Sequence, residues 1–174
     1  MNIARQEVED TTPFEGLDTS KPVLLLDVDG VINPISLARP TSWPDFVQVR
    51  VSNYDLWLSA GMGNHLARLG TTVIWCTTWC DDGPGLARIA RHMGALSPIH
   101  LCSWGGAWRW KQDMVLAALT TFPLVVWVDD DEHLNEDPDH LMKVTPDTLD
   151  GLQPEELDAV WRHVSAVLDK PQPA

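Results

Sequence analysis

Acidic residues stand directly after two apolar runs of this sequence. The stretch LLLDVDG places Asp27 and Asp29 two positions apart, and VVWVDDD places Asp129 and Asp130 side by side. Carboxylates gathered at close range cannot all stay ionised unless a cation neutralises them. Hard divalent ions prefer oxygen ligands, and Mg²⁺ commonly binds through one or two carboxylates while substrate phosphate supplies further oxygens. The acids therefore predict a metal site, with Mg²⁺ as the expected occupant.

Polar groups at two other points of the chain are candidates for the same pocket. Thr77 and Thr78 follow an apolar run, and Lys111 begins a segment with helical spacing. Ligands of open α/β sheets bind beyond the carboxyl ends of the strands, so these groups are expected to meet the acids there. Asp and Gly are also ordinary turn residues, but two acidic strand ends together with a Thr and a Lys are hard to explain as turns.

The spacing at the first strand end adds a geometric expectation. Side chains two residues apart on an extended segment point to the same side, so Asp27 and Asp29 are both expected to face the pocket. Gly30 then lets the chain turn sharply. Asn33 either ties that turn or is an ordinary turn residue.

Short apolar runs alternate with stretches of helical spacing along most of the chain. The runs predict strands, and the stretches between them predict helices. Their alternation predicts an α/β fold, a Rossmann-like parallel sheet in three layers with helices on both faces. Strands are expected at residues 23–28, 71–76, 99–102 and 124–128, with a weaker one at 141–144, and helices at 54–69, 84–93, 111–119 and 154–168.

One insert interrupts this alternation. Residues 32–51 contain prolines followed by FVQVRV, in which apolar residues recur at every second position. The pattern predicts a small hairpin flap beside the first strand, and the insert is too short for a separate cap domain. The polar ends of the chain predict a flexible arm at residues 1–20 and a tail at 170–174, around a single domain at 21–169.

The overall composition limits the possible partners. The 174 residues include 12 basic and 25 acidic ones, and the net charge of -13 opposes attraction to nucleic acid or anionic lipid. Any nucleic-acid contact must therefore be local. Because the sequence has no signal-like start and no apolar run of about 18 residues, we expect a cytoplasmic protein without a membrane partner. Three cysteines are too few for a disulfide framework and fit a reducing compartment.

The motifs together resemble those of the haloacid dehalogenase-like (HAD) superfamily. DVDGVIN resembles its first motif, VIWCTTW the second, Lys111 in WRWKQDMV the third and VVWVDDD the fourth, and all four occur in the family's order. The resemblance spans residues 23–131. With the closing GLQPEEL, the set is similar to small HAD domains grouped with bacterial RNA-repair proteins. This resemblance implies a HAD-like phosphatase without a cap domain.

The resemblance also implies a role for each motif. Asp27 would attack phosphorus and form a phosphoaspartate, which divides one hard displacement into two easier ones. Asp29 would protonate the leaving oxygen and later take a proton from water. Thr77 would donate a hydrogen bond to a phosphoryl oxygen, with Thr78 as the alternative because the TT pair leaves the register open. Lys111 would offset the charge on the nucleophile and the phosphoryl group.

The family pattern further implies how Mg²⁺ would be held. Its ligands would be Asp27, the backbone carbonyl of Asp29 and Asp130, with Asp129 close by or acting through water. Because dehalogenases of the superfamily lack the second acid of the first motif, the presence of both acids favours a phosphatase.

The substrate class is less constrained than the chemistry. Arg109 lies among Trp104, Trp108 and Trp110, and such a cluster either stacks on a base or sugar or packs into the core. Trp75, Trp79 and Trp127 are expected in the core. We take Gly30, Thr78, Trp108 and Arg109 as the candidate substrate-binding residues.

Three functions remain open from the sequence. The first is a Mg²⁺-dependent phosphatase of small phosphate esters. The second is a phosphatase of polynucleotide ends in nucleic-acid repair. The third is a non-catalytic binding module that keeps the metal site, although such a module has no need for both Asp27 and Asp29. The oligomeric state is also left open.

Overall fold

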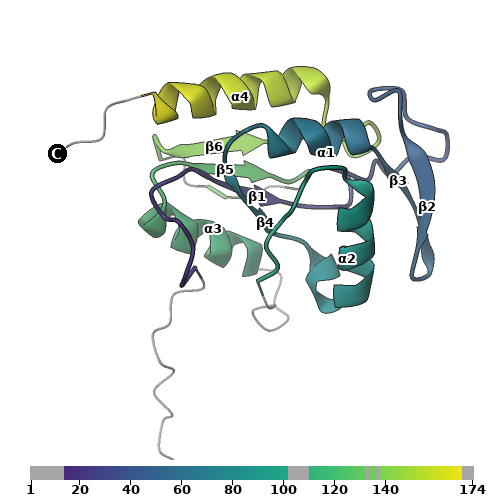
Figure 1. Cartoon of the computed structure of the whole chain (residues 1–174), viewed down its shortest axis with the longest axis horizontal. Helices are drawn as coiled ribbons and strands as arrows, with labels where there is room; N and C mark the ends of the chain where they lie inside the picture. The colour runs from purple at the N-terminus through teal and green to yellow at the C-terminus, as the bar shows by residue number, and fades with distance from the viewer. Residues whose placement is uncertain (1–13, 102–109, 132–133, 136–137, 170–174) are drawn as a thin grey trace, which may run out of the picture.

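Four parallel strands form the central sheet of this protein. The computed structural model describes residues 14–101, 110–131, 134–135 and 138–169. The sheet has the order β4-β1-β5-β6 (Figure 1). In the register, Leu26 pairs with both Trp75 and Val128, so the three strands end level with one another. The strands are β1 (Val23–Leu26), β4 (Thr72–Trp75), β5 (Val125–Val128) and β6 (Leu141–Val144).

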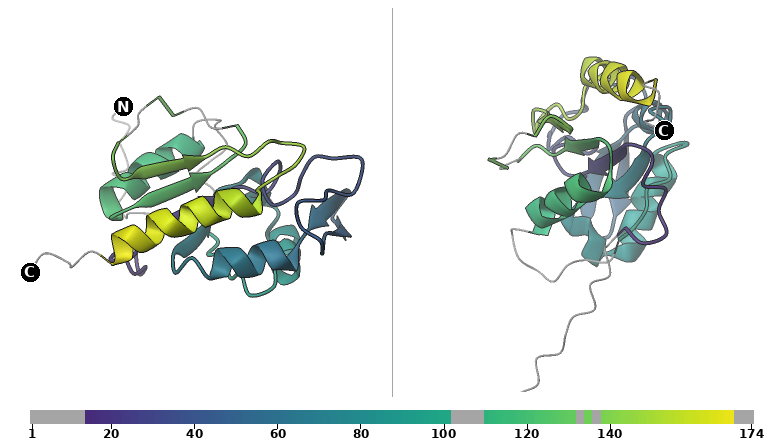
Figure 2. Two further views of the ribbon diagram at one scale, coloured as in Figure 1. Left: turned by 90° about the horizontal axis from the view of Figure 1, so that it is seen from above. Right: turned by 90° about the vertical axis from the view of Figure 1, so that its left-hand side faces the viewer.

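Helices cover both faces of the sheet. Figure 1 shows α1 (Ala60–Ala67) and α4 (Pro154–Leu168) on one side of it and α3 (Trp110–Thr121) on the other. Two views in Figure 2 confirm that α1 and α4 lie beside each other on their face. Apolar residues of α2 (Gly83–His92) belong to the same core cluster as those of α1 and α4. The predicted three-layer α/β architecture, compatible with a Rossmann-like fold, is therefore observed.

Burial on both faces explains the uniformly apolar strands. Every residue of β1 and β5 is buried, and alternate residues of each strand enter the two core clusters. Leu24 and Leu26 face the α1, α2 and α4 side, whereas Leu25 faces α3. α4 begins at Pro154 behind a capping box formed by Gln153 and Glu156, which satisfies backbone groups at the helix start. The sequence pattern identified these elements within a few residues.

One predicted helix is wrong in its first part, which belongs to a separate antiparallel hairpin. Residues 54–58 were expected in a helix over 54–69, but they form β3 (Tyr54–Leu58), which pairs with β2 (Val47–Val51). Only the second part of the predicted helix is helical, and α1 starts after the cap at Ser59. The apolar Leu56 and Leu58 are buried at alternate positions, which is the strand period of two rather than the helix period. The hairpin flap therefore exists, but with a later second strand than expected.

Two further expectations are corrected at the margins of the fold. The strand predicted at residues 99–102 is reduced, within the described residues, to an isolated bridge between Ile99 and Ile74. Pro98 directly precedes the bridge, and proline is confined to the edges and first residues of strands, which fits a single bridge beside the edge strand β4. In the expected arm at residues 1–20, Phe14 is only 2% exposed and packs edge-on against Phe122. The packed chain therefore starts before residue 21; residues 1–13 and the predicted tail lie outside the described residues.

None of the helices in the described part of the chain has the length and apolar character needed to cross a bilayer.

Candidate active site

The strand-end acids lie where the direction of the chain through the sheet reverses. From β1 the chain passes to β4 on one side, and it later enters β5 on the opposite side of β1. Asp27 follows β1 and Asp129 follows β5, so both stand at the carboxyl ends of neighbouring strands. A backbone hydrogen bond of 3.0 Å from Asp27 N to Val128 O continues the ladder to this point. This is the position at which open α/β sheets bind ligands.

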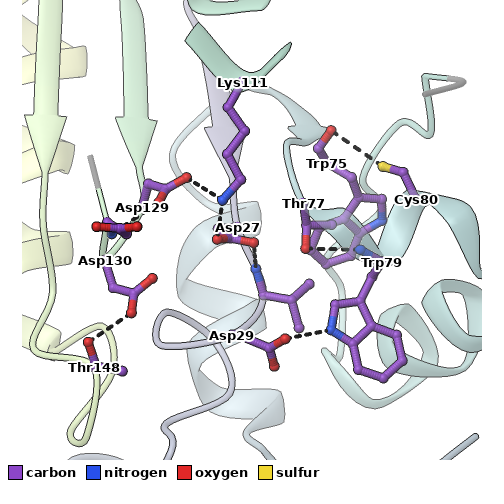
Figure 3. A network of polar contacts seen from close by, with 12 residues as sticks. Asp27, Asp29, Trp75, Thr77, Trp79, Cys80, Lys111, Asp129, Asp130 and Thr148 are labelled. Atoms are coloured by element: carbon purple, nitrogen blue, oxygen red, sulfur yellow. Dashed lines mark hydrogen bonds and ion pairs between the residues drawn. The ribbon is translucent and has the colours of Figure 1, made fainter. Parts of the chain in front are cut away.

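Lys111 joins the two buried acids. Its Nζ donates to Asp27 Oδ2 at 2.5 Å and to Asp129 Oδ2 at 2.7 Å (Figure 3). The lysine stands in the first turn of α3, on the opposite face of the sheet from α1, and its side chain is 21% exposed. Asp27 is 6% exposed and Asp129 is fully buried. Contact of one cation with two carboxylates leaves the group with a net negative charge.

Burial decides the electrostatics of this group. Desolvation raises the pKa of Asp27 to about 6, opposed by the charge of Lys111 and reinforced by that of Asp129. For Lys111, desolvation alone would lower the pKa, but the charges of Asp27 and Asp129 and their hydrogen bonds raise it above the usual range. Lys111 is therefore a permanent cation, whereas Asp27 changes protonation near neutral pH.

A third acid completes what we call the acidic cluster, Asp27, Asp129 and Asp130. One carboxylate oxygen from each lies within 4.8 Å of the others. Burial raises the pKa of Asp130, while Thr148 Oγ1 donates to Asp130 Oδ2 at 2.8 Å. Three carboxylates with one lysine form an all-oxygen, net-negative donor set, which suits a hard divalent ion such as Mg²⁺. The residues present therefore fit the expected metal.

Gly30 is required by the position of Asp130. Its φ is +70°, a conformation that side chains disfavour, and a Cβ at this position would lie 2.0 Å from Asp130 Oδ2. The backbone at Gly30 thus packs directly against a candidate metal ligand. A substitution here would displace the carboxylate of Asp130.

Asp29 stands apart from the acidic cluster, contrary to the expectation that it faces the same way as Asp27. Its Oδ2 accepts from Trp79 Nε1 at 2.9 Å and its Oδ1 from Asn33 Nδ2 at 2.8 Å. The chain bends at Val28, which ends the extended alternation on which the expectation rested. Figure 3 shows the Asp29 carboxylate turned toward Trp79. Its side chain is not in the metal-ligating group found among the described residues.

The two threonines after β4 have different environments. Thr77 is fully buried and its side chain hydrogen-bonds Asp27, which lowers the pKa of that carboxyl against the effect of burial. It also caps the short 3-10 helix η1 (Thr78–Asp81), accepting from Trp79 N at 3.4 Å. Thr78 is exposed. Of the two, Thr77 is the one in contact with the acidic cluster.

A pocket of about 620 Å³, which we call the hairpin pocket, opens beside Asp29. Side chains from the hairpin, from η1 and from the segment after β1 enclose it. The lining residues are Asp29, Asn33, Ile35, Tyr54, Asp55, Leu56, Thr78, Trp79, Asp81 and Asp82. Asp29 therefore lines the hairpin pocket, whereas Asp27, two residues earlier in the chain, belongs to the acidic cluster.

Sequence reasoning missed three contributors to the site. Trp79 was expected only in the core, but it also donates to Asp29. Tyr54 was assigned to a helix, and the alternation of Tyr54, Leu56 and Leu58 was the signal that could have placed it on a strand. Thr148 carried no local signal, because only the fold brings it to Asp130. The predicted Trp108 and Arg109 lie outside the described residues.

No protein-family model matches the chain, and comparison with curated proteins and with solved structures likewise found no match.

Proposed function

We propose that the protein is a Mg²⁺-dependent phosphatase of the HAD type that works without a cap domain. The observation that carries the proposal is the contact of Lys111 with Asp27 and Asp129 at the reversal point of the sheet, with Asp130 alongside. A buried nucleophile, a fixed cation and oxygen ligands for a metal are the parts that phosphoryl transfer needs. Between β1 and α1 the insert contains only the two-stranded hairpin of β2 and β3, which is small for a cap domain.

Asp27 acts as the nucleophile in the first step. One of its carboxylate oxygens bonds to phosphorus while the bond from phosphorus to the alcohol oxygen breaks. Asp29 gives its proton to that departing oxygen, so the alcohol leaves neutral. Hydrogen bonds from Trp79 and Asn33 hold the Asp29 side chain in place for this transfer.

Water releases the phosphate in the second step. Asp29 takes a proton from the water, whose oxygen bonds to phosphorus as the bond to Asp27 breaks. Phosphate departs, and both carboxyl groups return to their starting protonation states. Asp29 thus loses a proton to the alcohol in the first step and regains one from water in the second, and no further reactant is needed.

Lys111 and Thr77 stabilise the charge in both steps. The Lys111 ammonium lies at 2.5 Å from Asp27, where it can neutralise both the carboxylate and the incoming phosphoryl oxygens. The hydroxyl of Thr77, which hydrogen-bonds the Asp27 carboxylate, would transfer that hydrogen bond to a phosphoryl oxygen. Bound to the acidic cluster, Mg²⁺ would supply charge neutralisation and a template that orients the phosphoryl group.

Phosphate release from a mixed panel of esters tests this function. The panel contains small phosphate monoesters and oligonucleotides phosphorylated at the 5′ or the 3′ end, each assayed with Mg²⁺ and with a chelator. We expect release that needs Mg²⁺ and is absent in Asp27→Asn, while circular dichroism shows the variant to be folded. Preference for oligonucleotides would assign the repair role, and no release from a folded protein on any ester would leave a non-catalytic metal-binding module.

A further inference from the structure

The hairpin pocket is placed to receive the leaving group of the substrate, which is an inference that rests on the proposed function. If Asp29 protonates the departing oxygen, the carbon skeleton attached to that oxygen extends away from the acidic cluster past Asp29. Asp29 is one of the residues that line the hairpin pocket. The residues of this pocket therefore contact the alcohol portion of the substrate and determine which alcohols are accepted.

Negative charge dominates the lining of the pocket. Four of the lining residues are aspartates, Asp29, Asp55, Asp81 and Asp82, and the lining includes no Lys, Arg or His among the described residues. Asp82 accepts hydrogen bonds from Ser52 Oγ and Gly85 N. Asp55 pairs with Arg50 at 2.9 Å, but Arg50 stands outside the lining. A polyanion such as a nucleic-acid strand would meet repulsion here.

Aromatic rings stand among these carboxylates. Tyr54 and Trp79 contact each other edge-on with their centroids 5.6 Å apart. Tyr54 is 62% exposed and Ile35 is 48% exposed, so the rim of the pocket presents apolar surface that a ligand would cover. Aromatic faces attract organic cations through the ring quadrupole, and nearby carboxylates add to that attraction.

We propose that the hairpin pocket binds an organic ammonium group, so that the substrate is a phosphate monoester of an alcohol that carries a positive charge. The phosphate enters the acidic cluster beside Lys111, and the ammonium end lies in the hairpin pocket beside the exposed ring of Tyr54 and the aspartates of the lining. The phosphate end would face Lys111 and a metal held by the acidic cluster, and the ammonium end would face the aspartates of the pocket lining.

A pair of isosteric esters tests the proposal. Choline phosphate carries a trimethylammonium group, and its carbon analogue carries a neutral tert-butyl group of the same shape. We expect kcat/KM to be about 5- to 30-fold higher for choline phosphate, the range that a cation–π contact gives from partly exposed to desolvated sites. The same pair is measured for binding in Asp27→Asn, where no turnover occurs, so that recognition is read independently of chemistry.

Variants of the pocket locate the effect. Asp55→Asn and Asp81→Asn each remove one acidic residue from the lining, and the double variant should lower the preference for the cationic ester, measured as the ratio of kcat/KM for the two esters. Asp158→Asn is the matched control, because Asp158 is an exposed aspartate on α4 outside the pocket. Its preference should equal that of the unmodified protein.

The outcomes separate this proposal from the proposed function. Turnover without preference for the cationic ester, or with preference for oligonucleotides, overturns the pocket assignment and leaves the phosphatase standing. Absence of turnover on every ester of the panel, with selective binding of choline phosphate, overturns the phosphatase and supports the pocket. Neither turnover nor selective binding overturns both.

Discussion

Aspartates occupy two regions of this protein that differ in almost every physical respect. In the acidic cluster, Asp27 and Asp129 are 6% and 0% exposed, and Lys111 holds both. In the hairpin pocket, Asp55 and Asp81 are exposed. Burial makes the charge of a carboxylate costly, whereas an exposed carboxylate is open to contact with a ligand. We therefore propose chemistry for the first region and recognition for the second.

Removing the cation from the acidic cluster should have the largest effect. Lys111→Met leaves two buried carboxylates facing each other, so we expect the metal-free protein to lose about 3 kcal/mol of unfolding free energy. Phosphate release should fall by roughly 10²- to 10³-fold, since the charge on the phosphoryl group loses its partner. Denaturant titration and steady-state kinetics measure the two effects.

Lys21→Met is the control for this change, because Lys21 forms an exposed ion pair with Asp18 in which its side chain is 56% exposed. It should change stability by less than about 1 kcal/mol. If Lys111→Met were as mild as the control, the comparison between buried and exposed charge would fail.

The stability of the metal-free protein should depend on pH through Asp27 of the acidic cluster. Because the pKa of Asp27 is raised to about 6 from 3.8, the metal-free folded state keeps a proton that the unfolded state releases. Its contribution to stability is full below about pH 4 and is lost as the pH rises through about 6, a loss of about 3 kcal/mol. Asp27→Asn should remove this slope.

Unfolding titrations of the unmodified protein and Asp27→Asn, in chelator, measure the slope as the difference between them. Mg²⁺ should remove that difference by favouring the ionised carboxylate. A pH-independent difference in chelator would mean that burial does not govern Asp27.

Gly30→Ala should disturb the acidic cluster through one ligand. The new Cβ would lie 2.0 Å from Asp130 Oδ2, so we expect Mg²⁺ to bind about tenfold more weakly and stability to fall by about 1–2 kcal/mol. Gly16→Ala is the control, because Gly16 also has a positive φ, +83°, but nothing within 4 Å of the added Cβ. Calorimetric titration with Mg²⁺ should distinguish the two, and equal Mg²⁺ affinities would remove Asp130 from the metal site.

Trp79 lines the hairpin pocket and donates to Asp29, the proposed acid, and its conservative replacement should have the smallest effect. Trp79→Phe keeps a ring in the hairpin pocket but removes the N–H that donates to Asp29. We expect a several-fold loss of kcat, corresponding to about 1 kcal/mol, the net value of a typical hydrogen bond, and a larger loss for esters of poor leaving groups that need the proton. Aryl phosphates with good leaving groups should be nearly unaffected.

Trp57→Phe provides the matched control, since Trp57 donates its indole N–H to Ser36 O at 3.2 Å elsewhere on the hairpin. Equal losses for poor and good leaving groups in Trp79→Phe would show that the contact with Asp29 is only structural.

The sequence predicted the parts of the fold in which local pattern and burial agree. β1 and β5 are apolar throughout because both of their faces are covered, and α4 has apolar residues at helical spacing on its buried side. The hairpin was harder, because Tyr54–Leu58 leads directly into α1 and its apolar residues were read with the period of the helix. Edge pairing at Ile99 depends on neighbours that a sequence window does not contain.

The site residues divide in the same way, into those that the local pattern predicts and those that depend on tertiary packing. Asp27, Asp129 and Lys111 were identifiable because each follows a strand or begins a helix whose position the topology determines. The orientation of Asp29 was not, because a bend at Val28 turns its side chain away from the cluster. The contact of Thr148 with Asp130, 18 residues apart, is produced by tertiary packing alone.

The central claim, that Asp27 carries the phosphoryl group, is tested most directly by trapping it. The unmodified protein is mixed with Mg²⁺ and the best ester of the panel, quenched in acid during turnover, digested and examined by mass spectrometry. The account predicts one added phosphoryl group on the peptide that contains Asp27, located at Asp27 by fragmentation and absent from Asp27→Asn. Turnover that leaves Asp27 unmodified, or a phosphoryl group on another residue, would contradict it.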